Sequence, residues 1–273
     1  MPHRAFWIWT TLSLAAVGWA HARAAESVWV LYAGSLVTPM EGPVKSALAT
    51  EGIAFEGQGG GSKMLANLIA SDAKSPDVFI AVDPAVVSGL GDRVAYAAAF
   101  ASTSLGIGWS ENSKYAGLFD AVAAGKGSLL EALTTRGLTI GRTDPRLDPK
   151  GAYTVEAMKL LAGAAGAGRI LGTDDNPAQT FPEEDLIARV ETGQADVGFF
   201  YRTEAAARGL HFTPLPGAAS LSQKITYVLA ILRNGPHPKS AIAFRDFILN
   251  GEGKRILQAA GLDYFEKPRI LKV

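Results

Sequence analysis

Two short segments place glycine and serine together at positions where an anion could be held. Residues 33–36 (AGSL) follow one apolar run, and residues 59–62 (GGGS) follow another. We expect each segment to lie where the carboxyl end of a strand meets a helix N-terminus, the edge at which open α/β sheets bind ligands. Backbone N–H groups and the helix dipole favour negative charge there, glycine allows close approach, and the hydroxyls of Ser35 and Ser62 add donors. The alternative is that both serines only cap their helices.

Other patterns give little support to catalysis. The chain has no cysteine, and neither His211 nor His237 has a histidine partner at the spacing of a metal site. The H-E-x-x-H, G-x-S-x-G and P-loop motifs are absent from the sequence. We therefore expect a binding protein that is not an enzyme and carries no cofactor.

Alternating strands and helices must position the glycine–serine segments. Short apolar runs predict strands, and apolar residues at helical spacing predict helices. The first set comprises strands at 28–32, 53–56 and 77–82 with helices at 36–50 and 63–70. The second comprises strands at 138–141 and 197–201, helices at 153–161 and 183–192, a β-rich run at 223–232, and helices at 240–250 and 253–260. This alternation predicts an α/β fold with doubly wound sheets.

Two of the apolar runs are interpreted as crossings between two lobes. These are residues 104–109 and 225–232. We therefore expect lobe one at residues 26–105 plus 226–273, and lobe two at residues 106–225. Two interrupted lobes with a cleft between them suit a ligand that is enclosed by hinge closure. The Ala/Gly-rich stretch at 162–168 is expected to be a flexible turn.

The first two dozen residues have the layout of a secretory signal peptide. Arg4 precedes an apolar run at residues 5–18, and small residues follow at Ala20, Ala22 and Ala24. We expect residues 1–24 to be removed and the remaining chain to be periplasmic, the alternative being an N-terminal membrane anchor. An exported chain without cysteine carries neither disulfides nor a lipid on an N-terminal cysteine.

The charge balance bears on the partners. Without Arg4 and Arg23 the chain keeps 24 basic and 26 acidic residues, a net charge of −2. This argues against nucleic acid or an anionic membrane as a partner, since both favour a basic surface. About 250 residues are enough for two lobes with an ordinary hydrophobic core, and we expect a monomer.

Six segments of the chain resemble, in their order and spacing, a known family. They are residues 33–36, 59–62, 77–83 (DVFIAVD), 141–145 (GRTDP), 148–153 (DPKGAY) and 190–203 (VETGQADVGFFYRT). Together they resemble the molybdate/tungstate-binding proteins of ABC transporters, including the tungstate-selective branch. The resemblance implies a type II periplasmic binding fold with two doubly wound lobes, a hinge and a central cleft. It also implies an ABC permease in the inner membrane as a partner.

The resemblance further implies which groups hold the oxyanion. The donors would come from Ser35, Gly61 and Ser62, from the segment Lys150, Gly151 and Ala152, from an N–H near Glu183, and from the hydroxyl of Tyr201. Neutral donors and helix ends can hold a dianion without a buried counter-charge. For Tyr201 the alternative is a plain core tyrosine.

The coordination of the ligand depends on Asp148. In the tungstate-selective branch the matching carboxylate is implied to bind the metal centre directly, with a second carboxylate where this chain has Phe200. Asp148 would therefore act alone, and a buried carboxylate beside a dianion repels it or takes up a proton. The alternative is that Asp148 only shapes a turn before Pro149.

Three cations near these motifs are expected at the surface. Arg142, Lys150 and Arg202 would pair with neighbouring carboxylates, or Arg202 would face the cleft mouth and steer anions inward. Asp83 and Asp144 are expected to close turns or cap helices.

The sequence thus predicts the binding component of an importer that captures molybdate or tungstate. A receptor for sulfate or phosphate is the nearest alternative, because Asp148 could accept the proton of phosphate. A periplasmic enzyme or sensor that reuses the fold is the alternative from another class.

Overall fold

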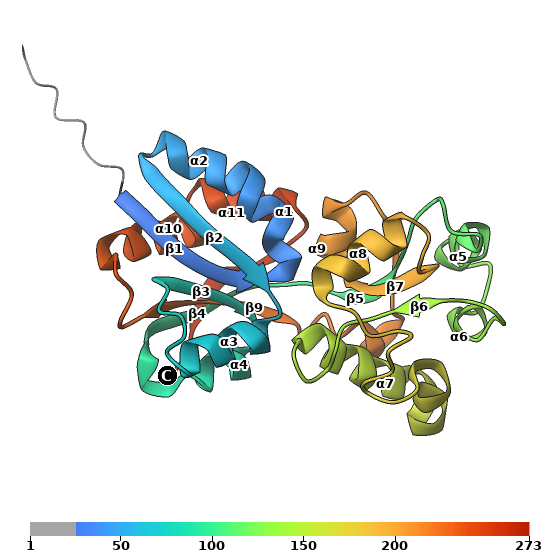
Figure 1. The fold of residues 1–273 in the computed structure, drawn as a ribbon. Helices are drawn as coiled ribbons and strands as arrows, with labels where there is room; N and C mark the ends of the chain where they lie inside the picture. Colours follow the sequence, from blue (N-terminus) through green and yellow to red (C-terminus); the bar gives the residue numbers. More distant parts are fainter. Residues whose placement is uncertain (1–25, 273) are drawn as a thin grey trace, which may run out of the picture.

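The structure is a computed structural model that describes residues 26–272, apart from the side chain of Glu184. Two β-sheets lie at opposite ends of an elongated molecule, each covered by helices (Figure 1). The predicted signal peptide at residues 1–24 lies outside the described residues. Within residues 26–272, no helix is both long and apolar enough to cross a membrane.

The larger sheet has six strands in the order β10-β4-β9-β3-β1-β2. Its strands are β1 (Glu26–Ala33), β2 (Ile53–Gly60), β3 (Val78–Val82), β4 (Val94–Ser102), β9 (Thr226–Leu232) and β10 (Asp263–Ile270). The strand β1 runs parallel to β2 and β3, and β9 runs antiparallel to β3 and β4. All residues of β3 and β9 are buried, as expected for central strands covered on both faces.

Helices cover both faces of the larger sheet. They are α1 (Val37–Pro39), α2 (Lys45–Thr50), α3 (Ser62–Ala70), α4 (Pro84–Ser88), α10 (Pro238–Asn250) and α11 (Glu252–Ala259), with the 3₁₀ turns η1 (Gly34–Leu36) and η3 (Gly91–Arg93) and the π turn η2 (Met40–Val44). Val28 and Val30 belong to one core cluster with residues of α2 and α10, whereas Leu31 packs with α3 and α4. The side chains of β1 therefore alternate between two buried faces.

The smaller sheet has four strands in the order β6-β7-β5-β8. Its elements are β5 (Leu105–Trp109), β6 (Ile140–Gly141), β7 (Val197–Tyr201), β8 (His211–Pro214), α5 (Ala116–Ala123), α6 (Leu129–Leu133), α7 (Pro149–Leu171), α8 (Glu183–Glu191), α9 (Arg202–Ala207) and the 3₁₀ turn η4 (Gly217–Ser220). Phe200 packs with Leu186 and Val190 of α8, while Phe199 and Tyr201 belong to the main core cluster. Neighbouring residues of β7 thus face opposite sides of the sheet.

The chain passes from the larger to the smaller sheet after β4 and returns before β9. The six-stranded sheet takes its strands from residues 26–102 and 226–270, and the four-stranded sheet takes its strands from residues 105–214. The lobe boundaries themselves stay a prediction.

Several elements differ from the predicted ones. The strand β2 continues through the glycine-rich segment to Gly60, where a loop from residue 57 was expected. The helix α7 is longer than predicted and includes the expected turn at 162–168, although Gly163, at φ 69°, interrupts its helical backbone. The strands β4, β8 and β10 and the short helices α4, α5, α6 and α9 were not predicted.

Candidate functional site

The two glycine–serine segments lie side by side at one edge of the larger sheet. The parallel register of β1 and β2 pairs Ala33 with Gly60, so η1 and α3 begin at neighbouring positions. In parallel strands both carboxyl ends meet at the same sheet edge. Ser35 and Ser62 are both buried there. The predicted juxtaposition of the two segments is present in the structure.

Neither serine caps a helix with its side chain. The Oγ of Ser62 accepts the N–H of Val82 at 3.1 Å, which leaves the hydroxyl proton of Ser62 free to donate. The Oγ of Ser35 lies 2.9 Å from the hydroxyl of Tyr227, which in turn lies 3.3 Å from Thr203 Oγ1. Both hydroxyls are thus oriented by residues other than those of their own turn, and the capping alternative is wrong.

The two oxygens of Asp148 have different surroundings. Asp148 is the N-cap of α7, and its Oδ1 accepts the Lys150 N–H at 3.0 Å. The Oδ2 atom and the nearby Thr143 Oγ1 are buried and make no hydrogen bond of good geometry, although the Thr143 hydroxyl lies close enough to the carboxylate to lower its pKa. Burial raises the pKa of Asp148 to about 6, and the charge of Glu183 adds to this rise while Lys150 opposes it. The residue shapes a helix start and also presents a free acceptor.

The backbone N–H groups of the segment after Asp148 are partly used within the protein. The Lys150 N–H is bound by Asp148 Oδ1, and the Ala152 N–H donates to the Asp148 carbonyl at 3.4 Å. Gly151 packs against the backbone at Thr143, where a side chain would overlap the Thr143 carbonyl. Among the three residues predicted to donate, Gly151 is the one whose N–H is not taken by these two bonds.

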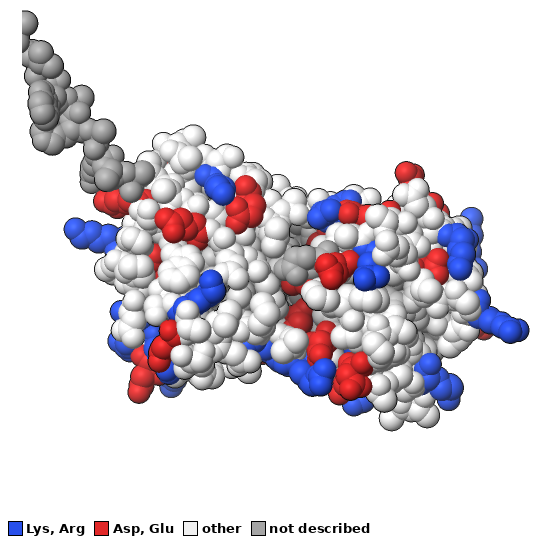
Figure 2. All heavy atoms as spheres, viewed as in Figure 1, with Lys and Arg blue, Asp and Glu red and all other residues white. Residues whose placement is uncertain are grey.

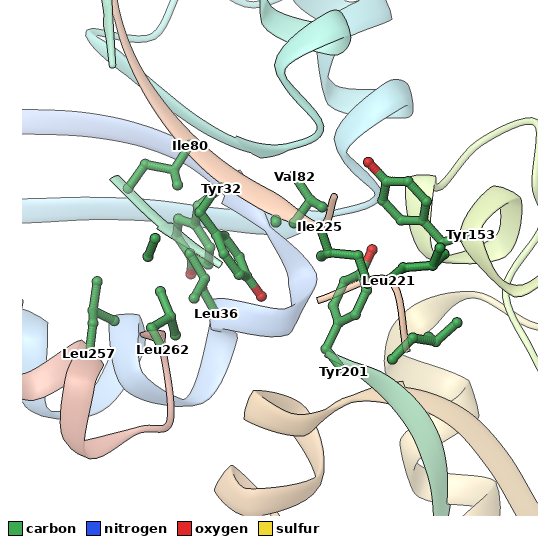
Figure 3. Close-up of a cluster of buried hydrophobic side chains, with 14 of the residues drawn as sticks. Tyr32, Leu36, Ile80, Val82, Tyr153, Tyr201, Leu221, Ile225, Leu257 and Leu262 are labelled. Carbon is green, nitrogen blue, oxygen red and sulfur yellow. The ribbon is translucent and has the colours of Figure 1, made fainter. Parts of the chain in front are cut away.

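Tyr201 ends β7 at the boundary between the sheets. Its side chain is almost fully buried, yet its Oη has no hydrogen-bond partner. Figure 3 shows this side chain rising toward Ile225, beside Tyr153 from α7. Burial raises the pKa of Tyr201, and the charge of Asp148 adds to the rise. Since a buried hydroxyl costs free energy unless it finds a partner, Tyr201 is a candidate donor to a ligand.

Lys150 lies inside the protein, bonded to two carboxylates. Its Nζ contacts Glu183 Oε1 at 3.0 Å and Glu204 Oε1 at 2.5 Å, and none of its side chain is exposed. The other Glu204 oxygen accepts the Tyr201 N–H at 2.8 Å. Burial acts to lower the pKa of Lys150, but Glu183, Glu204 and Asp148 raise it above its ordinary value. We call Lys150, Glu183 and Glu204 the buried charge cluster.

Two of the three cations do not lie as expected. Lys150 and Arg142 are fully buried, and Arg142 donates to the carbonyls of Leu171 and Thr173. Arg202 is partly exposed, and it donates to the Gly261 carbonyl and pairs with Asp263 at the start of β10. The expectation of surface pairs is therefore wrong for the first two residues. Asp83 does cap a helix, accepting the N–H of Ala85.

Glu183 borders two hollows between the sheets. One, of about 300 Å³, is lined by Gly61, Met64, Thr143, Asp144, Leu147, Asp148, Thr180, Phe181, Pro182 and Glu183. The other, of about 80 Å³, includes Gly34, Ser35, Glu183 and Glu204. Figure 2 shows acidic side chains along the narrow waist between the two halves of the molecule. Among the predicted residues, Gly61, Asp148 and Glu183 line the larger hollow, and Ser35 and Glu183 line the smaller one.

Sequence reasoning missed the Glu204 side chain and used only the backbone of Glu183. A glutamate three residues after the N-cap is the spacing of a capping box, which could have indicated that Glu204 bonds to the Tyr201 N–H. Phe200, where a second carboxylate was considered, is buried in an apolar cluster. In the described part of the chain, no group of three His, Cys, Asp or Glu side chains is arranged to hold a metal ion.

Two helix-covered sheets with buried polar groups and hollows in the region between them are typical of solute-binding proteins. The family of bacterial extracellular solute-binding proteins matches residues 28–263. The chain belongs to this family, which consists of binding proteins rather than enzymes.

Relatives agree with this assignment. A Haloferax volcanii protein, whose provisional name is ABC transporter molybdenum-binding protein, is 31% identical over 203 residues, 72% of this chain and 62% of that protein. The chain thus spans less than two thirds of that relative. The molybdate/tungstate-binding protein of Thermococcus kodakarensis is 24% identical over 88% of this chain and 82% of its own. The chain is a solute-binding protein related to molybdate/tungstate-binding proteins.

A solved structure shows the same fold. The periplasmic molybdate-binding protein of Azotobacter vinelandii superposes with a TM-score of 0.63 at 18% identity, over 86% of this chain and 97% of that chain. The prediction of a two-lobed periplasmic binding fold is confirmed.

Proposed function

We propose that the protein captures molybdate or tungstate between its two sheets in the periplasm and delivers it to the permease of an ABC importer. The observation that carries the proposal is the meeting of buried polar groups at the interlobe region. Tyr201 Oη is buried without a partner and close enough to Asp148 to respond to its charge, and Asp148 and the Thr143 hydroxyl lie beside one another at the larger hollow, next to Gly61. A bound oxyanion would satisfy the Tyr201 hydroxyl, which is otherwise costly to bury.

The donor set suits a small oxyanion more than an organic cation or a peptide. Ser35, Ser62 and Tyr201 supply hydroxyl donors, and α7 and α8 begin at the same region with the positive ends of their dipoles. The resemblance to molybdate/tungstate-binding proteins and the names of two relatives favour these metal oxyanions. Asp148 Oδ2 is the group that would bind the metal centre directly and expand its coordination.

Sulfate or phosphate is the competing ligand class. Asp148 Oδ2 is a buried acceptor that could take the proton of hydrogen phosphate, whereas sulfate brings no proton to it. Isothermal titration against tungstate, molybdate, sulfate and phosphate separates these possibilities. We expect tight binding of tungstate and molybdate, and tight binding of sulfate or phosphate alone would refute the assignment.

The serine donors can be tested by substitution. Ser35→Ala and Ser62→Ala should each weaken tungstate binding roughly tenfold or more, because a hydrogen bond to a charged group contributes about 1.5–3 kcal/mol. Ser46→Ala is the matched control, since Ser46 is exposed and bonds only to the Gly42 carbonyl. Ser62→Ala also leaves the buried Val82 N–H without its acceptor, which could destabilise the fold. Titrations are therefore made on variants whose folding has been checked by circular dichroism. Unchanged affinity in the double variant would remove both serines from the site.

A further inference from the structure

Glu183 differs from the other acids of the interlobe region in how weakly its charge is supported. Glu204 accepts both the Lys150 ammonium and the Tyr201 N–H. Asp148 accepts an N–H at the start of α7. Glu183 accepts the ammonium of Lys150, which it shares with Glu204, and its other close polar neighbour is the Glu204 carboxylate itself, which disfavours a second negative charge. Of these three carboxylates, Glu183 is therefore the one most easily protonated.

The position of Glu183 brings it to the proposed anion site. Its carboxylate lies directly against Gly34 of the first serine segment, where any larger side chain at position 34 would overlap Glu183 Oε2. Among the hollows described above, it lines both the one that contains Asp148 and the one that contains Ser35. An anion held by Ser35 therefore contacts or closely approaches this carboxyl group.

Charge balance then requires a proton. Asp148, Glu183 and Glu204 together carry three negative charges when ionised, against one positive charge on Lys150. Arg208 borders the smaller hollow, but its guanidinium pairs with Glu191. From the larger sheet, Glu183 is faced by Gly34, Ser35 and the neutral hydroxyl of Tyr227. A dianion added to this buried group leaves a large uncompensated charge unless a carboxylate is protonated.

We propose that Glu183 is a recognition residue of the oxyanion site, whose carboxyl is protonated in the complex and donates a hydrogen bond to an oxyanion oxygen. This inference rests on the function proposed above. A protonated carboxyl is a donor, so it suits an oxyanion that carries no proton of its own, such as tungstate, molybdate or sulfate. Lys150 and Glu204 act as positioning residues that hold the Glu183 carboxyl over Gly34.

The affinity for the anion should depend on pH through the protonation of the Glu183 carboxyl. Burial raises the pKa of Glu183 to about 8, with Lys150 opposing and Glu204 adding to the rise. A dianion beside the carboxyl raises this pKa further, so the protonated form binds more tightly. Between about pH 8 and about pH 10, affinity should therefore fall by up to about tenfold per pH unit.

Titration calorimetry with tungstate at about pH 9, in two buffers of different ionisation enthalpy, measures the number of protons taken up. We expect close to one proton for the native protein. Glu183→Gln should bind tungstate with no proton uptake and with an affinity independent of pH over the same range. Glu156→Gln is the control, because Glu156 is exposed and pairs with Lys224, and it should behave as the native protein does.

The outcomes separate the inference from the function on which it rests. Tungstate binding by the native protein without proton uptake would overturn the inference alone, and so would a full proton uptake that persists in Glu183→Gln. If neither tungstate nor molybdate binds the native protein at any pH tested, the proposed function and this inference fail together.

Discussion

At the scale of single residues, polar atoms without partners mark where stability is given up for binding. A buried donor or acceptor without a partner costs about 1–3 kcal/mol. Tyr201 Oη belongs to this class, and Thr143 Oγ1 and Asp148 Oδ2, which lie beside one another at the larger hollow, make no hydrogen bond of good geometry. The buried charge cluster adds to this cost, because charges that share one counter-ion are costly to desolvate.

Replacing Tyr201 with phenylalanine separates binding from stability. Tyr201→Phe removes only the hydroxyl, which has no hydrogen-bond partner in the protein. We expect the free energy of unfolding to stay unchanged or rise, while tungstate affinity falls roughly tenfold or more with the loss of a hydrogen bond to an anion. Urea unfolding and calorimetry measure the two quantities.

Tyr264→Phe provides the control for the tyrosine test. Its hydroxyl donates to the Ile248 carbonyl, away from the interlobe region. This variant should lose stability and keep its affinity, the reverse of Tyr201→Phe. Equal affinity of Tyr201→Phe and the native protein would show that the hydroxyl does not reach the ligand.

The sequence predicted the places of single residues well where these depend on local structure. Ser35, Ser62, Asp148 and Tyr201 follow or precede strands and helices that periodicity identifies. The burial of Lys150 could not be predicted, because its partners Glu183 and Glu204 are 33 and 54 residues away along the chain. Side chains of this type are normally exposed, and only tertiary pairing reverses that preference.

At the scale of elements, strands that are short apolar runs were predicted, whereas β4, β8 and β10 were missed. The strands β1, β3 and β7 are short apolar runs, and their predicted bounds match closely. The strand β4 (VAYAAAFAS) is rich in alanine, which is depleted in strands. The strand β10 contains Pro268 and several charged residues, and it forms an edge of the sheet, where proline is tolerated. The pairing of both strands depends on neighbours far away in sequence.

The start of α3 lies close to the segment that precedes α7. A Cβ at Gly61 would lie 2.9 Å from the Leu147 carbonyl and 3.5 Å from the Asp148 Cβ. Gly61→Ala should therefore hinder the approach of the two sides and weaken tungstate binding roughly tenfold, because less of the protein reaches the binding-competent state. Calorimetry measures the affinity, and thermal unfolding of the free protein should change little.

Gly42→Ala is the matched control for Gly61→Ala. Position 42 lies in the turn η2, and a Cβ there would meet nothing within 4 Å. Native affinity in Gly42→Ala together with weakened affinity in Gly61→Ala is the expected pattern. Native affinity in both variants would show that tungstate binding does not need the close approach of the two sides at Gly61.

At the scale of the whole molecule, two groups of hydrogen bonds join the larger-sheet side to the smaller-sheet side. Beside the chain crossing, Arg202 bonds to Gly261 and Asp263, and Thr203 bonds to Tyr227. Beside the larger hollow, Lys63 Nζ donates to the Pro145 carbonyl at 2.9 Å, and the Met64 N–H donates to the Leu147 carbonyl at 3.2 Å. In a hinge motion, the second group would break while the first persists, because residues near the axis move least.

Lys63→Ala tests whether the hydrogen bonds beside the larger hollow break when the two sides move apart. The substitution removes the hydrogen bond from Lys63 to the Pro145 carbonyl without removing a proposed ligand donor. The free protein should therefore shift toward an open form. Affinity should fall a few-fold, in proportion to the lost population of the closed form. Small-angle X-ray scattering should give a larger radius of gyration for free Lys63→Ala than for the free native protein, and the same smaller value for both at saturating tungstate.

Lys126→Ala, which alters an exposed lysine after α5, should match the native protein in both states. A native radius of gyration that does not change on adding a ligand shown to bind would contradict closure around the anion and leave Lys63 as a static contact.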